Sequence, residues 1–185
     1  MYLGIDQSLT STGITIYDGI DFVYKLLKTE KTKGTKCPTI DYTRRLLSLK
    51  SQINEVLDEY NITYAAMEGM SYGSRGSTIF DLGGLSHIIR ELLISKEIDF
   101  IIVPPKTLKK YWTGSGNANK SDMVKVAEDE DYNINILKNY ATKKNPDIRP
   151  DDNIVDSLAL CRFLDDYKSG LLNSYEDIIE RSWDM

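Results

Sequence analysis

Apolar and polar residues alternate over the first thirty positions of the chain, as they do in strands that bury one face. The alternation predicts three strands, at residues 2–6, 13–18 and 21–29. A turn around Asp18 and Gly19 joins the second strand to the third, which makes the three an antiparallel meander. Two short apolar runs farther along the chain predict a fourth strand at 63–69 and a fifth at 98–104.

Apolar residues at helical spacing lie between and after these strands. We expect helices at 41–60, 77–97, 105–112, 119–131 and 152–168, and a short one near 174–182. Three antiparallel strands followed by alternating helices and strands predict an α/β fold, with a five-stranded mixed sheet and helices on both faces. The polar stretch at 133–150 predicts a flexible segment.

The length of 185 residues predicts one domain, with a core at about 1–168 and a short acidic tail. No apolar run approaches the roughly 20 residues that span a bilayer, and no signal peptide precedes the first strand. We therefore expect a soluble, intracellular protein. Cys37 and Cys161 lie far apart without a CxxC motif, so we expect neither a disulfide framework nor a thiolate zinc site.

The charges are unevenly distributed, although the net charge is -5. Eight lysine and arginine residues face two acids between Lys25 and Lys50, and five lysines face one acid between Val103 and Lys125. Acidic residues concentrate at 128–131 and after Phe163. Such segregation can build a basic face on an acidic protein, although a solvated charged surface explains the counts equally well.

Two acidic residues end predicted strands. Asp6 shares a strand face with Gly4, and Glu68 shares one with Ala66, because side chains alternate along a strand. Each small residue leaves space beside the acid. If the two strands are neighbours, both carboxylates converge in one open notch.

A further acidic group begins the last long helix, in PDDNIVDSLALCRF. Asp152 and Asp156 are four residues apart and share a helix face, whereas Asp151 after Pro150 suits the N-cap. Clustered carboxylates repel one another, and oxygen ligands favour Mg²⁺ or Mn²⁺. Turn formation or capping accounts for each acid singly, but the set of Asp6, Glu68, Asp152 and Asp156 fits a two-metal site that cleaves phosphodiesters.

Two nucleotide-binding interpretations compete with this one. The segment GSGNANKS at 114–121 nearly matches a P-loop, but Asn119 stands where a glycine is needed and a helical turn precedes it. We interpret Asn119 as an N-cap paired with Asp122. The opening GIDQSLTSTG also resembles the first phosphate loop of actin- and hexokinase-like ATPases, which need two such subdomains and a longer chain. His87, the only histidine, lies in a helical pattern and is interpreted as a partly buried helix residue.

The chain resembles the RuvC family of Holliday junction resolvases, of the ribonuclease H-like superfamily, with a composition compatible with a phage-type member. Four segments carry the resemblance in the family's order: GIDQSLTSTGI, YAAMEGMSYG, VPPKTLKKYWTGSGNANKSDMVKVA and DDNIVDSLAL. The resemblance implies a ribonuclease H-like fold and a Mg²⁺-dependent endodeoxyribonuclease that cuts four-way DNA junctions with two metal ions and water as nucleophile. It also implies that Mn²⁺ can substitute, that the protein is a homodimer, and that it works in the cytoplasm of a bacterial cell or a phage-infected host.

The resemblance places metal ligands at Asp6, Glu68, the 151–153 stretch and Asp156, and lysines near the scissile phosphate at Lys109 and Lys120. The family's third acid falls on Asn153. We favour Asp152 as the third ligand, because an ionised oxygen binds Mg²⁺ better than an amide does, and keep Asn153 as the alternative.

Other positions are candidate DNA contacts. Tyr72, offset by one position from the family's aromatic residue, is expected to stack on bases at the opened junction, or else to pack locally. Arg75, Lys106 and Lys110 are candidate phosphate contacts, or else plain surface charge. The helix at 77–97 resembles the family's dimer element, in which Gly83-Gly84 would let backbones approach. We expect no membrane and no nucleotide cofactor as partner. A module that binds branched DNA without cutting it, and an enzyme that acts on RNA, are the alternatives.

Overall fold

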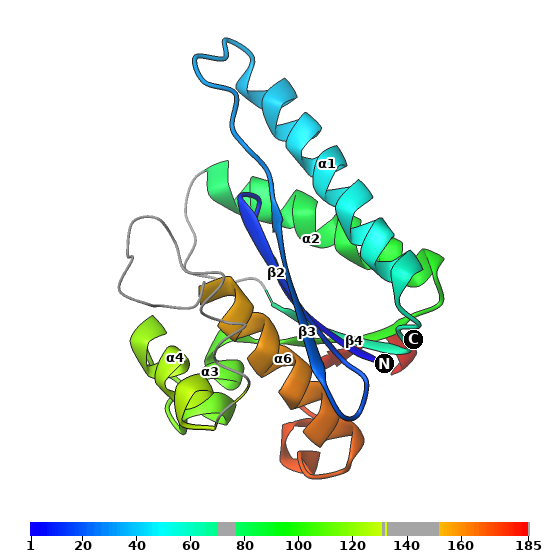
Figure 1. Cartoon of the computed structure of the whole chain (residues 1–185), viewed down its shortest axis with the longest axis vertical. Helices are drawn as coiled ribbons and strands as arrows, with labels where there is room; N and C mark the ends of the chain where they lie inside the picture. Colours follow the sequence, from blue (N-terminus) through cyan, green and yellow to red (C-terminus); the bar gives the residue numbers. More distant parts are fainter. Residues whose placement is uncertain (70–76, 131, 133–151, 185) are drawn as a thin grey trace.

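A six-stranded mixed sheet runs through the middle of the computed structural model, which describes residues 1–69, 77–130, 132 and 152–184, with the backbone alone at 77–81 (Figure 1). The strand order is β3-β2-β1-β4-β5-β6. The strands are β1 (Tyr2–Asp6), β2 (Ser11–Tyr17), β3 (Phe22–Lys28), β4 (Tyr64–Glu68), β5 (Asp99–Val103) and β6 (Glu180–Arg181). The pairs β1/β4 and β4/β5 are parallel, and the other three pairs are antiparallel.

The predicted meander and the five predicted strands are confirmed, whereas the helix expected near 174–182 is wrong. That region holds a short 3₁₀ turn at Asn173–Tyr175, then β6, and a second 3₁₀ turn at Ser182–Asp184. The strand β6 forms because β5 offers it a free edge at Ile101 and Ile102. The Phe100 N–H also donates to Ser182 Oγ over 2.9 Å. These partners are remote in sequence, so no local pattern announces the strand.

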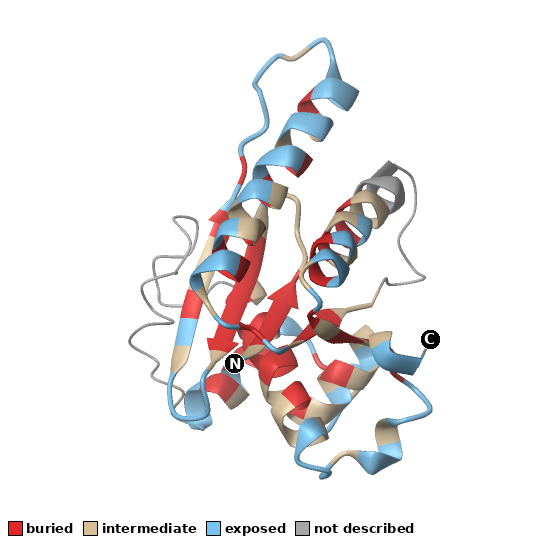
Figure 2. Ribbon diagram, turned by 90° about the vertical axis from the view of Figure 1, so that its right-hand side faces the viewer, coloured by how far each residue is buried: buried red, intermediate tan, exposed pale blue. Residues whose placement is uncertain are grey.

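Two helix layers cover the sheet, as the alternation of helices and strands predicted. The helices α1 (Pro38–Glu59) and α2 (Ser77–Ser95) pack on one face. The opposite face carries α3 (Pro105–Thr113), α4 (Lys120–Asp129) and α6 (Asp152–Lys168). Buried residues gather in the strands and on the helix faces that meet them (Figure 2). In the described part of the chain, no helix is long and apolar enough to cross a bilayer. The stretch 133–150, expected to be flexible, lies outside the described residues.

Three glycines set how closely the helices approach their neighbours. A Cβ at Gly4 would lie 2.0 Å from Ser157 O, and one at Gly13 would lie 1.9 Å from Asn153 O. The backbone of α6 therefore rests directly on β1 and β2. A Cβ at Gly84 would lie 2.5 Å from the Tyr42 hydroxyl, so this glycine admits α1 against α2 within the chain.

Candidate active site

The carboxyl ends of two neighbouring parallel strands carry the first two candidate ligands. The register pairs Gly4 with Ala66 and Ile5 with Met67, so Asp6 and Glu68 stand at the same level. Side chains alternate along a strand, so Asp6 and Glu68 lie on the face of the sheet where Gly4 contacts α6. Ile5 and Met67 lie on the other face, in the core beneath α1 and α2. The predicted convergence of these two strand ends is confirmed by the pairing of β1 with β4.

A glutamine links the two strand ends. Gln7 Nε2 donates to the Glu68 carbonyl oxygen over 2.8 Å. Its Oε1 and the hydroxyl of Ser11 are buried and have no hydrogen-bond partner within the described residues. Gln7 was not among the predicted site residues, because strand alternation would turn its side chain away from that of Asp6. Its side chain crosses to β4 only because β1 ends at Asp6.

The first turn of α6 brings the second pair of carboxylates to the same place. Asp152 and Asp156 begin this helix, and the contact of Asn153 with Gly13 places the helix start beside Asp6, since Gly13 pairs with Asp6 in the sheet. Asp151, predicted as the N-cap, lies outside the described residues.

Asn153 and Asp152 are engaged differently. Asn153 Nδ2 donates to the Ser11 carbonyl oxygen at the start of β2. Asp152 Oδ2 accepts a hydrogen bond of 2.8 Å from Lys120 Nζ. Lys120 opens α4 directly after Asn119, whose side chain accepts from the backbone of Ser121 and Asp122 in a capping box. The predicted N-cap role of Asn119 is thereby confirmed.

The pKa shifts of three of these side chains indicate that their charges act on one another. Burial and, to a lesser degree, the charge of Asp156 raise the pKa of Glu68 to about 7, although Lys109 and Lys120 oppose the shift. Burial likewise raises the pKa of Asp156 to about 6, with Asp152 adding to the effect and the same two lysines opposing it. The hydrogen bond to Asp152, with the charges of Asp156 and Asp6, raises the pKa of Lys120.

This arrangement fits a divalent cation. Within the described residues, no three acidic, cysteine or histidine side chains lie close enough to hold a metal ion as they stand. Repulsion between buried carboxylates favours such spacing when only the ammonium groups of Lys109 and Lys120 offset their charge. The donor set is nevertheless all oxygen and strongly anionic, and a hard cation would relieve the repulsion that raises the pKa of Glu68 and Asp156.

The remaining candidates are less well placed. Lys109 is partly exposed and its charge lowers the pKa of Glu68, whereas Lys106 and Lys110 of α3 are exposed. Tyr72 and Arg75 lie outside the described residues. These four positions stay predictions as DNA contacts.

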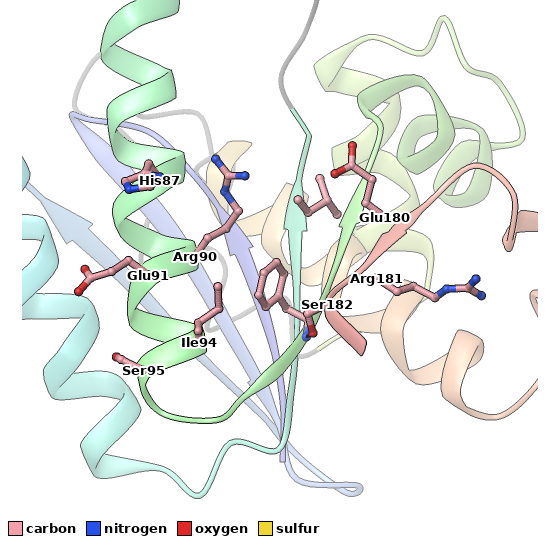
Figure 3. Close-up of a pocket in the computed structure, with 10 residues that line it drawn as sticks. His87, Arg90, Glu91, Ile94, Ser95, Glu180, Arg181 and Ser182 are labelled. Carbon is pink, nitrogen blue, oxygen red and sulfur yellow. Dashed lines mark hydrogen bonds between the residues drawn. The ribbon is translucent and has the colours of Figure 1, made fainter. Parts of the chain in front are cut away.

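A cavity of about 630 Å³ lies on the opposite face of the sheet, between α2 and the C-terminal strand β6 (Figure 3). Phe100 and Ile102, which line it, belong to the core beneath α1 and α2 and not to the α6 side. The cavity therefore has no part in the carboxylate site. His87 also lines it and is exposed, so the expectation of partial burial for this histidine was wrong.

Comparison with known proteins agrees with this geometry. The family described as Crossover junction endodeoxyribonuclease RuvC matches residues 2–160. A RuvC of this name from Brachyspira hyodysenteriae is 27% identical over 124 residues, which cover 67% of this chain and 76% of that protein. The structure of Thermus thermophilus RuvC superposes with a TM-score of 0.66 at 15% identity and covers 92% of this chain and 96% of its own. The structure of the same protein in complex with Holliday junction substrate gives a TM-score of 0.64 at 16% identity with the same coverage. These superpositions confirm the predicted mixed α/β fold.

Proposed function

Since the chain belongs to the RuvC family, we propose that it is a structure-selective endodeoxyribonuclease that cuts four-way DNA junctions by phosphodiester hydrolysis. One observation carries the proposal beyond family membership. Four acidic side chains from β1, β4 and α6 meet two lysines from α3 and α4 in one electrostatic environment at the carboxyl edge of the sheet. Acids arranged only for turns and caps have no reason to gather there.

The RuvC nuclease family is metal-dependent. We assign Asp6, Glu68, Asp152 and Asp156 as the ligands of two Mg²⁺ ions, for which Mn²⁺ can substitute. When bound, the two ions supply an activated water and a stabilised leaving oxygen. We assign Asp6, which is buried at the end of β1, to both ions.

The lysines act on the substrate. The phosphodiester gains negative charge in the transition state, and a positioned ammonium stabilises that charge. Lys109 and Lys120 are the two ammonium groups that face the acids. Lys120 forms an ion pair with Asp152 in the free protein. When DNA and metal bind, its ammonium would contact a phosphate oxygen in place of this carboxylate.

Asp152 is the better third ligand. The amide nitrogen of Asn153 donates to Ser11 O, which commits this side chain to the end of β2. Asp152 instead accepts a hydrogen bond from the ammonium of Lys120, and its charge raises the pKa of Asp156. An ionised oxygen in that position also offers the stronger ligand for a hard cation.

We also propose that the protein works as a homodimer on branched DNA. A four-way junction has two opposed strands to cut, and a twofold dimer presents one site to each. The exposed side of α2 is the proposed contact. The buried side of α2, with Leu85, Ile89 and Leu93, is already used against the chain's own core, as the alternative interpretation of this helix holds.

A nicking assay on synthetic substrates tests the function. Wild-type protein with Mg²⁺ is expected to nick opposed strands of a four-way junction, and removal of Mg²⁺ abolishes nicking. Asp6→Asn should lose nicking and keep junction binding, whereas Asp177→Asn, at an exposed tail position, should behave as wild type. Binding without nicking by the wild-type protein would favour a non-catalytic module. Preferential cutting of the RNA strand of a hybrid would favour a ribonuclease.

A further inference from the structure

A cluster of cations lies on the connection between β3 and α1, away from the carboxylates. Over residues 28–45, which we call the basic arm, six lysine and arginine residues face two acids in a chain of net charge -5. Five of the six basic side chains are exposed: Lys28, Lys31, Lys33, Lys36 and Arg44. The arm forms one end of the long axis of the molecule, where β3 leads into α1 (Figure 1).

The cations of the arm are not used for stability. None of the five forms an ion pair within the part of the chain that the structure describes. Basic side chains elsewhere do so, as in the pairs Lys50–Glu91 and Lys96–Asp58, with N–O distances of 2.7 and 2.6 Å. Five exposed cations within residues 28–44 that form no ion pair among the described residues repel one another, and water screens that repulsion. An anionic ligand would relieve that repulsion.

The base of the arm is held firmly in place. Buried Asp41 accepts a hydrogen bond of 3.0 Å from the Thr32 N–H, which ties the arm to the first turn of α1. Arg45 donates to Thr29 Oγ1 over 2.9 Å and to the Leu9 carbonyl oxygen over 3.2 Å. Asp41 and Arg45 thus anchor the arm to the rest of the fold, and the exposed cations extend from a fixed base.

The same anchor connects the arm to the candidate active site. Leu9 and Thr10, which Arg45 contacts, belong to the turn that follows Asp6. The arm therefore leaves the sheet at the edge where the carboxylates gather and extends beyond it.

We propose that the basic arm binds the phosphate backbone of a duplex arm of the DNA, outside the cleaved phosphodiester. The proposal rests on the proposed function, which identifies the ligand as branched DNA. The arm would give this acidic protein a second anion-binding surface. Contacts of this kind place the substrate without reading its sequence. The arm takes no part in bond cleavage.

Salt dependence of binding tests the proposal with matched variants. Lys31→Gln, Lys33→Gln and Lys36→Gln are combined in one protein. Lys50→Gln, Lys96→Gln and Lys168→Gln, which lie outside the arm, remove the same charge in the control. Both carry Asp6→Asn so that the DNA stays intact, and thermal unfolding confirms that each is folded. The probes are a four-way junction with long arms, a junction with arms of a few base pairs, and a linear duplex.

Each phosphate contact contributes roughly 0.9 to the slope of log affinity against log salt. The arm variant should therefore lose roughly 2–3 from this slope on the long-armed junction and on the linear duplex, while the control keeps the wild-type slope. The slope difference corresponds to a roughly 16- to 64-fold smaller loss of affinity between 50 and 200 mM salt. On the short-armed junction the arm variant and the control should agree. With Asp6 restored, the rate of nicking at saturating DNA should be unchanged.

Two results would overturn the proposal. A wild-type slope for the arm variant on long-armed DNA would leave an acidic protein surface as the better partner for the arm. An equal loss on short-armed and long-armed junctions would place the arm at the junction centre. If the wild-type protein nicks no branched DNA but the arm variant still loses slope on the linear duplex, the arm proposal stands while the proposed nuclease function fails.

Discussion

Replacing Glu68 with glutamine tests whether a buried, repelling carboxylate cluster exists. Burial and the charge of Asp156 raise the pKa of Glu68 from its ordinary 4.5 to about 7. The folded chain therefore favours the neutral form. The stability that protonation contributes is fully present below about pH 4.5 and is lost as the pH rises through about 7. Glutamine resembles the neutral form at every pH, so Glu68→Gln should stabilise the metal-free protein above neutral pH.

The size of this effect follows from the same two pKa values. A carboxyl with a pKa near 7 in the folded chain and 4.5 in the unfolded chain disfavours folding by about 3 kcal/mol at pH 8 and by less than about 1 kcal/mol at pH 5. The expected gain at pH 8 is thus about 2–3 kcal/mol. In a chain of this length it raises Tm by roughly 5–10 °C.

Thermal unfolding in EDTA at pH 5 and pH 8 measures the gain. Glu176→Gln, at an exposed position of the C-terminal segment, removes the same charge and should leave Tm unchanged at both pH values. The diagnostic quantity is the difference in Tm gain between the two pH values, because any packing effect of the amide is common to both. An equal gain at pH 5 and pH 8, or a loss of stability at pH 8, would refute the raised pKa of Glu68.

Three further predictions concern the same site. Mg²⁺ should raise the Tm of the wild-type protein more at pH 8 than at pH 6, because protons on Glu68 compete with the cation. It should raise the Tm of Glu68→Gln much less than that of the wild-type protein. Equal Tm shifts at the two pH values, or in the two proteins, would count against these ligands. Asp152→Asn should abolish nicking, whereas Asn153→Ala should keep most of the nicking activity. Asn153→Ala should lower the unfolding free energy by about 1 kcal/mol, because it loses the hydrogen bond to Ser11. The reverse pattern of nicking would make Asn153 the ligand. Gly13→Ala should cost about 1–3 kcal/mol in urea unfolding, because its Cβ would lie 1.9 Å from Asn153 O, and should slow nicking by displacing α6. Gly69→Ala, with no contact under 3.3 Å, is the matched control, and equal costs would contradict the close approach of α6.

Much of the fold could be predicted from local sequence. Alternation located three strands and short apolar runs located two more. Asp6 and Glu68 could be assigned to the same strand faces as Gly4 and Ala66, since the side of a strand on which a residue lies depends only on parity. The N-cap at Asn119 was predictable for a similar reason, because a capping box is complete within four residues. The basic segments were likewise visible as residue counts.

The tertiary structure alone decided which of these residues meet. Lys120 reaches Asp152 across 32 positions, and Asn153 reaches Ser11 across 142, and no local pattern encodes either pairing. Both depend on α6 lying directly against Gly4 and Gly13, and the sixth strand depends on the free edge of β5. Local sequence determines the conformation and the facing of each element through short-range sterics and hydrogen bonding. The distance between elements is determined by which surfaces pack together, and the chemistry of the site depends on that distance.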